Sequence, residues 1–342
     1  MKIKIKQQLS PISQDEMDGL ESLIILLPAL KKASSGPIFP YSTLLKQRLK
    51  RQGQSNWGST PWPVDLPNDL GTQLTVTTVK ANASQFELLS LGRSLASKHL
   101  TRDPKHLAIA FVSMDDQLIH RCSDALLSAF YAACYPMPTY KQKKKPRKRL
   151  ANVTCYGLKE KFIGKRTLAA SHGNNLAREL TCLPPNELTP SRYRKKVQEL
   201  AKKSNWQMTF YDLKALQQKK AGAFLAVAQG SSINDAGIIH LRYHPKGRAT
   251  TQQAQLALVG KGICFDTGGT NLKPAKSMHG MHEDMEGSAV ALGTLLALSE
   301  LKVPFPVDCW LALSENLIGP RSYKQNDVVI AGNGLSIEIM HT

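Results

Sequence analysis

Residues 256–298 constrain the fold more than any other part of the sequence. They begin with a short apolar run, 256–259, which predicts a buried strand that ends at Gly260. A loop rich in Gly and Lys follows, and from Met285 onward small and apolar residues recur at helical spacing. This order of strand, polar loop and helix predicts a sheet with helices on both faces, in which sites form beyond the strand ends.

Four charged residues mark this stretch as a candidate site. Asp266, Lys273 and Asp284 follow Lys261 by 5, 12 and 23 residues. Carboxylates can ligate divalent metals through oxygen. A lysine beside them can stay protonated and polarise an oxygen, or lose its proton and bind metal. The set indicates a site that polarises a carbonyl and activates water, and a salt-bridged loop shaped by glycine is an equal alternative at this point.

The histidines and the cysteine of this stretch are weaker candidates for site residues. His279 and His282 have HxxH spacing, but no second histidine follows at the position that a zinc-protease helix requires. A polar loop face is therefore favoured over histidine ligation. Cys264 lies between isoleucine and phenylalanine, which favours a thiol buried in the core over a nucleophile.

The rest of the chain alternates strands and helices, which predicts an α/β protein of two domains, 1–160 and 165–342. In the first domain we expect strands at 74–79, 107–112 and 152–156, helices at 86–100 and 117–135, and a loop at 52–67. In the second domain we expect helices at 166–183 and 190–203 and strands at 207–211, 237–243 and 307–313. Thr189 and Pro190 are a plausible cap and first turn for the helix that follows them.

The basic charge is concentrated in the first half. Residues 1–170 hold 26 Lys/Arg and 12 Asp/Glu, a net charge of +14 out of +19 for the chain. The densest run, 141–149, predicts either contact with a phosphate backbone or, more often for such runs, a solvated loop. The candidate nucleic-acid contacts in it are Lys143, Lys144, Lys145, Arg147, Lys148 and Arg149.

Targeting and redox signals indicate a cytoplasmic protein. The amino terminus is charged and is not followed by an apolar signal region, and the apolar run 23–27 is far too short to span a bilayer. The six cysteines are scattered and contain no CxxC pair, which is typical of a reducing compartment. We therefore expect no membrane partner.

The central stretch resembles the leucine aminopeptidase (cytosol aminopeptidase) family of dimetal exopeptidases. The resemblance lies in VGKGICFDTGGTNLKP, a methionine-rich turn, DMEGSA and the small-residue helix that follows. It extends over about 165–342, where 175–180 and 185–190 look like the family's domain-entry helix and turn, and 223–231 looks like its strand and loop. It implies a mixed-sheet metallopeptidase domain preceded by a macro-like α/β regulatory or assembly domain.

The resemblance also implies roles, cofactors and partners. Asp266 would bridge two divalent ions, manganese or zinc, and Lys261 and Asp284 would complete the more exchangeable site, where the amino group of the substrate also binds. Lys273 would polarise the scissile carbonyl, and Met281 would line the pocket for the N-terminal side chain. The implied activity is removal of leucine-like N-terminal residues from peptides, and the implied assembly is a hexamer.

One part of the family pattern has no counterpart in this sequence. In the family the strand end that corresponds to 339–342 continues into NTDAEGR, which supplies an aspartate, a glutamate and an arginine to the site. Here His341 replaces the usual asparagine, and Thr342 is the last residue. We therefore expect an incomplete catalytic domain that alone neither binds a metal pair tightly nor hydrolyses peptides. The alternative is a catalytically dead basic scaffold or nucleic-acid-binding protein derived from the family.

Overall fold

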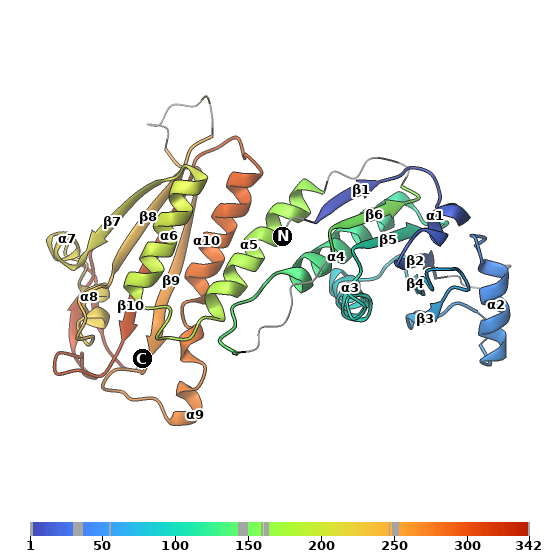
Figure 1. Ribbon diagram of the computed structural model, residues 1–342. Helices are drawn as coiled ribbons and strands as arrows, with labels where there is room; N and C mark the ends of the chain where they lie inside the picture. Colours follow the sequence, from blue (N-terminus) through green and yellow to red (C-terminus); the bar gives the residue numbers. More distant parts are fainter. Residues whose placement is uncertain are drawn as a thin grey trace. The chain divides into compact units, whose positions relative to one another are not determined.

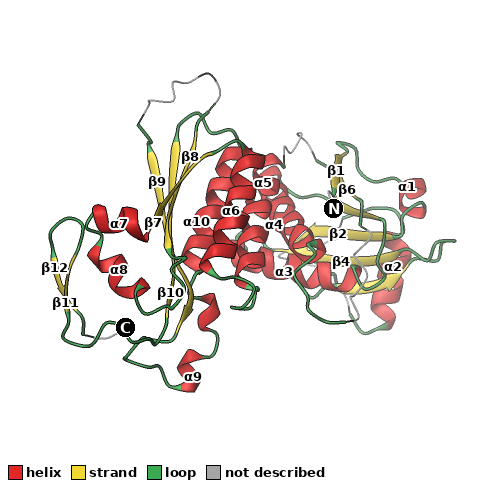
Figure 2. Ribbon diagram, turned by 60° about the vertical axis from the view of Figure 1, so that its left-hand side comes forward, coloured by secondary structure: helices red, strands yellow, loops and turns green. Residues whose placement is uncertain are grey.

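The structure, a computed structural model, describes residues 3–29, 37–54, 56–142, 150–158, 160, 164–245, 247 and 253–340. The chain forms two compact units, Met1–Pro136 with Lys141–Leu168 and Met137–Tyr140 with Ala169–Thr342. Both units combine a sheet with helices (Figures 1 and 2), so the predicted α/β class is confirmed. Within the described ranges, no helix is long and apolar enough to cross a membrane.

The first unit contains a six-stranded sheet in the order β1-β6-β5-β2-β4-β3. All neighbouring strands are parallel except β3, which pairs antiparallel with β4. The strands are β1 (Lys4–Gln7), β2 (Ser22–Pro28), β3 (Trp62–Asp65), β4 (Gln73–Val79), β5 (His106–Phe111) and β6 (Asn152–Tyr156). Apolar residues of β2 are buried on both faces, as is usual for the centre of a parallel sheet.

Helices cover the two faces of this sheet. They are α1 (Gln14–Asp18), α2 (Ser42–Arg51), α3 (Gln85–His99) and α4 (Asp116–Cys134). Ile24 and Leu26 of β2 pack in one core with residues of α3 and α4. Leu23, Ile25 and Leu27 pack in a second core with Met17 of α1 and Leu45 of α2. The alternation of side chains along one strand therefore supplies both cores.

The sequence predicted most of this unit, with one error. Strands β4, β5 and β6 and helices α3 and α4 match the expected ranges to within about a residue at each end. The segment 52–67 was expected to be a loop, but its end forms the short strand β3. Pro63 has no N–H to give to a sheet, and an edge strand is where a sheet tolerates proline.

The second unit is built on a four-stranded sheet in the order β7-β8-β10-β9. Strand β8 (Gly237–Tyr243) pairs antiparallel with both β7 (Gln207–Asp212) and β10 (Val307–Asn316). Strand β9 (Leu256–Asp266) is parallel to β10. A separate ribbon consists of β11 (Val328–Ile330) and β12 (Ser336–Glu338). The sheet is mixed, as the resemblance implied.

Helices α6 (Pro190–Ser204) and α10 (Glu286–Glu300) cover one face of this sheet (Figure 1). Tyr193 and Val197 of α6 and Leu292 of α10 share a core with Leu241 and Leu311 of the sheet. The remaining elements are α5 (Lys165–Thr181), α7 (Leu213–Gln218), α8 (Gly222–Ala228), α9 (Ala275–Met278) and a 3-10 turn, η1 (Met281–Glu283). The predicted cap of α6 is confirmed, because the Thr189 hydroxyl accepts a hydrogen bond from the N–H of Arg192.

Two expectations for the second unit were wrong. Strand β9 does not end at Gly260 but runs to Asp266, so Lys261 lies within the strand. The glycines that suggested a loop are there because α10 packs close, and a Cβ at Gly260 would lie 2.4 Å from Cα of Ser288. The second error is the segment 223–231, which resembled the family's strand and loop, because Gly222–Ala228 forms helix α8. A short apolar run does not distinguish a buried strand from a helix.

Candidate functional site

A cavity of about 510 Å³ lies at the end of β9 and contains two of the predicted site residues. Lys261 and Asp266 line it from β9, and Asn316 lines it from the end of β10. The other walls come from α8, Tyr323 and the β12 end of the ribbon, through Ala223, Ala226, Val227, Ile263, Val329, Ile337, Glu338, Ile339 and Met340. The cavity therefore brings together charged groups and an apolar wall.

A shift in strand register places Lys261 and Asp266 in the same cavity. Side chains five positions apart in a regular strand point to opposite faces of the sheet. Here Ile263 pairs with Ser314 and Asp266 pairs with Asn316, so β9 uses one more residue than β10 over this interval. An extra residue of this kind re-aims the side chains that follow it. As a result, Lys261, Ile263 and Asp266 all line one cavity.

Asp266 is buried, and both of its carboxylate oxygens accept hydrogen bonds. Its Oδ1 accepts from the backbone N–H of Gly268 at 2.9 Å and from Nδ2 of Asn316 at 2.7 Å, and Lys273 Nζ donates to its Oδ2 at 2.5 Å. Burial alone raises the pKa of this carboxyl, but the hydrogen bonds from Lys273, Gly268 and Asn316 outweigh it and hold the pKa below its usual value. Asp266 is therefore an anion at neutral pH.

Lys261 and Asp284 form a second ion pair. Lys261 Nζ lies 2.8 Å from Asp284 Oδ1, and the lysine side chain is 59% exposed whereas that of the aspartate is 21% exposed. The other carboxylate oxygen, Oδ2 of Asp284, is buried and has no hydrogen-bond partner among the described residues. A buried carboxylate oxygen without a partner costs free energy unless another group binds it. This oxygen fits the role of a metal ligand.

The remaining predicted residues have different positions. Lys273 follows β9 and contacts Asp266, but Met281, at the start of η1, is half-buried and is not among the described residues that line the cavity. His279 is exposed and His282 lies 4.0 Å from Glu283. No group of three His, Cys, Asp or Glu side chains in the described part of the chain is placed to hold a metal ion. The six candidate nucleic-acid contacts, from Lys143 to Arg149, lie outside the described residues.

Asn316 and Tyr323 are site residues that the sequence argument did not single out. Asn316 donates to Asp266 and lies 3.3 Å, Nδ2 to Oη, from Tyr323. The signal for Asn316 was available, because it ends the strand that runs parallel to β9 and parallel neighbours end at the same edge of a sheet. Tyr323 lies in the segment after β10 and gives no comparable signal.

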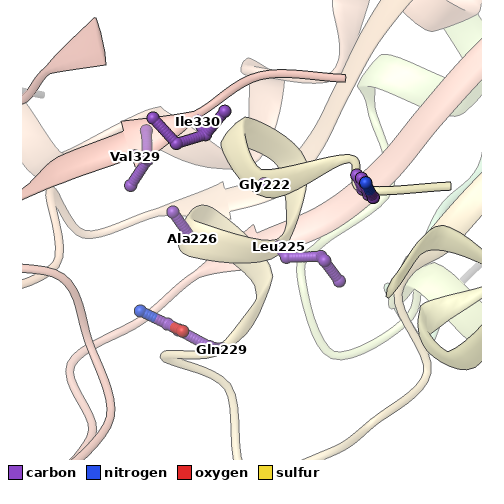
Figure 3. A pocket seen from close by; sticks show the side chains of 7 residues that line it. Gly222, Leu225, Ala226, Gln229, Val329 and Ile330 are labelled. Atoms are coloured by element: carbon purple, nitrogen blue, oxygen red, sulfur yellow. The ribbon is translucent and has the colours of Figure 1, made fainter. Parts of the chain in front are cut away.

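A second cavity of about 440 Å³ adjoins the first along α8 and β11 (Figure 3). Ala226 and Val329 line both cavities. Figure 3 shows the side chains of Val329 and Ile330 on the ribbon beside α8, with Ala226 facing them. The wall between the two cavities is therefore apolar and is formed by small or branched side chains.

Comparisons with known proteins agree with the motifs of the second half of the chain. Residues 175–342 match the model of the cytosol aminopeptidase family, catalytic domain. The chain is 41% identical over 192 residues to a probable cytosol aminopeptidase of Desulfovibrio desulfuricans, an alignment covering 53% of this chain and 38% of the relative. It is 34% identical over 267 residues to a probable cytosol aminopeptidase of Prochlorococcus marinus, which covers 77% of this chain and 53% of the relative. The chain thus spans about half or less of the length of these relatives.

A solved structure agrees on the fold. A mutant of tomato leucine aminopeptidase superposes with a TM-score of 0.80 and 23% identity, over 99% of this chain and 68% of that one. Residues 175–342 thus match the catalytic-domain model of the family, and the fold of the chain agrees with that of the tomato enzyme. The resemblance inferred from the motifs is thus confirmed for residues 175–342, which match the cytosol aminopeptidase family, catalytic domain, and the chain aligns with curated relatives of that family.

Proposed function

We propose that the protein is a metal-dependent aminopeptidase that removes leucine-like N-terminal residues from peptides, with residues 165–342 as its catalytic part. The observation that carries this proposal is the pair of lysine–carboxylate contacts at the end of β9, Lys273 with Asp266 and Lys261 with Asp284, in a segment that matches the family model. Residues 1–160 would then be a regulatory or assembly domain, and the assembly a homo-oligomer such as a hexamer, in the cytoplasm.

The residues present fit part of a two-ion centre. Asp266, Asp284 and the side-chain nitrogen of Lys261 would hold two divalent ions, manganese or zinc. The Oδ2 of Asp284, which has no partner among the described residues, supports this assignment. When bound, such ions lower the pKa of a water molecule and so supply a nucleophile near neutral pH. Two carboxylates are few ligands for two dications, so we expect weak metal binding by residues 1–342 alone.

The lysines and the apolar wall would have separate tasks. Lys273 is 19% exposed and already donates to a carboxylate, so its ammonium is suited to stabilise negative charge on the oxygen of a peptide carbonyl. Asp284, beside Lys261, would receive the amino group of the substrate, since an ammonium is attracted to a carboxylate. Apolar side chains such as Ile263 and Val329 would contact the substrate side chain.

The test is hydrolysis of leucine anilide in the presence of Mn²⁺. We expect little hydrolysis by residues 1–342 alone. We expect clear hydrolysis when they are combined with a polypeptide corresponding to the remainder of the Prochlorococcus relative, and loss of that activity in Asp266→Asn. A matched control is Lys276→Met, which removes an exposed lysine of α9. A stable complex of the two polypeptides without hydrolysis would contradict the proposal.

A further inference from the structure

Asn316 contacts the segment that follows β9 at several points. It is 5% exposed, and its Nδ2 donates to Asp266 Oδ1 at 2.7 Å. Its backbone oxygen accepts two further hydrogen bonds from Thr267, from the N–H at 2.9 Å and from the hydroxyl at 2.8 Å. One residue at the end of β10 therefore holds both the side chain of Asp266 and the backbone that turns away from it.

Tyr323 supports this arrangement from the other side. It is 6% exposed, its hydroxyl lies 3.3 Å from Asn316 Nδ2, and its backbone oxygen accepts from the Thr270 hydroxyl at 2.6 Å. Gly269 passes between these residues with a φ of +62°, and a Cβ there would lie 3.1 Å from Asn316 Oδ1. The segment 267–270 is thus packed closely against both side chains.

These contacts distinguish the two oxygens of the Asp266 carboxylate. Two N–H donors bind Oδ1, whereas among the described residues Lys273 alone binds Oδ2. A carboxylate without such donors rotates readily about its last torsion, because that torsion has a broad minimum. Fixing it in advance lowers the cost of ordering the group when a ligand binds.

We infer that Asn316 is a positioning residue, which holds Asp266 so that Oδ2 is the oxygen presented to the metal ions and to Lys273, with Tyr323 supporting Asn316. The inference rests on the proposed function for what Oδ2 binds. The orientation itself rests on the hydrogen bonds alone, so it can be tested without metal or activity.

The test uses amide hydrogen exchange followed by NMR, with the Gly268 N–H as the reporter because its acceptor is Asp266 Oδ1. Asn316→Leu keeps the approximate size of the side chain and removes its donor. We expect exchange at Gly268 to accelerate by about tenfold, the effect of losing one hydrogen bond to a charged group, and Mn²⁺ affinity to fall. Tyr323→Phe retains the ring and removes only the hydroxyl, so we expect a smaller change of the same sign.

Ser322→Ala is the matched control. Ser322 is a buried residue of the same segment that bonds to Gly319 and Leu317 and not to Asp266. Unchanged exchange at Gly268 in folded Asn316→Leu, or an equal acceleration in Ser322→Ala, would overturn the inference. Faster exchange in Asn316→Leu with unchanged Mn²⁺ affinity would overturn the role of Asn316 in presenting Asp266 to metal ions. Wild-type protein that binds no Mn²⁺ in any form would count against the proposed function, while the exchange rates would still decide the orientation.

Discussion

Lys261 Nζ lies 2.8 Å from Asp284 Oδ1, and this contact joins the middle of β9 to the turn that precedes α10. The strand and the helix are adjacent in the fold, and the pair lies where the helix begins. Because the lysine side chain is 59% exposed, water screens much of the attraction. The contact is therefore a weak source of stability, and its importance has to be sought in binding.

Lys261→Met separates the contribution of this contact to stability from its contribution to metal binding. We expect the free energy of unfolding to change by less than about 1 kcal/mol, as for other exposed ion pairs, and Mn²⁺ binding to weaken strongly. Urea denaturation and a Mn²⁺ titration measure the two quantities. Lys276→Met, an exposed lysine on α9, should change neither. If Lys261→Met left Mn²⁺ affinity unchanged, Lys261 would not be a ligand.

Gly293→Ala should destabilise the second unit, although alanine is the better helix former. A Cβ at Gly293 would lie 2.5 Å from the backbone oxygen of Gly173, so α5 and α10 would have to move apart. We expect a net loss of about 1–3 kcal/mol in the free energy of unfolding, the usual cost of overpacking. Val290→Ala on the same helix is the control, because Val290 is 58% exposed. An increase in stability in Gly293→Ala would disprove the close crossing.

Acid should destabilise the first unit through His99. This histidine is fully buried between Ser22 and Thr75, and burial, with nearby Lys98 and Arg102, lowers its pKa from 6.5 to about 4. The unfolded chain then binds more protons than the folded one between these two pH values. Stability is therefore retained above pH 6.5 and falls as the pH drops toward 4, by about 3 kcal/mol at most.

The measurement is amide exchange in β2 across this pH range, corrected for the intrinsic rate at each pH. His99→Gln should be less stable at pH 7 but should lose the part of the pH dependence that comes from this group. His106→Gln, at an exposed position, is the control and should keep it. A pH dependence that is identical in wild type and His99→Gln would refute the assignment.

Thiol reactivity should distinguish Cys182 from the buried cysteines. Cys182 is exposed, whereas Cys122, Cys155, Cys264 and Cys309 are buried. Burial raises the pKa of Cys155 to about 12 and raises that of Cys264 as well, which leaves little reactive thiolate. With an aromatic disulfide reagent we expect Cys182 to react fast and the four buried thiols to react only on unfolding. Cys182→Ser should remove the fast phase, and Cys264→Ser should leave it intact.

Sequence patterns predicted the elements whose signals are local. The alternating residues of β4 and the Thr189–Pro190 start of α6 are determined by neighbours along the chain, and both were located to within about a residue. Strand β9 was predicted too short because its glycines do not mark a loop. They allow the close packing of α10, an element distant in the sequence. The nature of α8 also depends on tertiary packing, since its apolar run is compatible with either type of element.

The candidate site also combines features that the local sequence predicts with features that depend on tertiary contacts. The four charged residues were identified from their types and spacing, and the structure brings them together as two lysine–carboxylate pairs. Which lysine contacts which aspartate did not follow from the spacing. Asn316 is distant from Asp266 in the chain and meets it only through the pairing of β9 with β10, so its role required knowledge of strand register.

The extra residue in β9 makes the length of this segment a constraint in its own right. If β9 paired regularly at its present length, Asp266 would lie five positions from Lys261 and its carboxylate would point to the opposite face of the sheet. Deleting one residue between Ile263 and Asp266 would remove the extra residue and leave the two side chains four positions apart, on the same face. Substitutions at Phe265 would leave that geometry in place. Relatives that share the chemistry should therefore keep the spacing of five together with the extra residue, or a spacing of four in a regularly paired strand. A spacing of five in a regularly paired strand would mark a protein in which the two groups no longer act together.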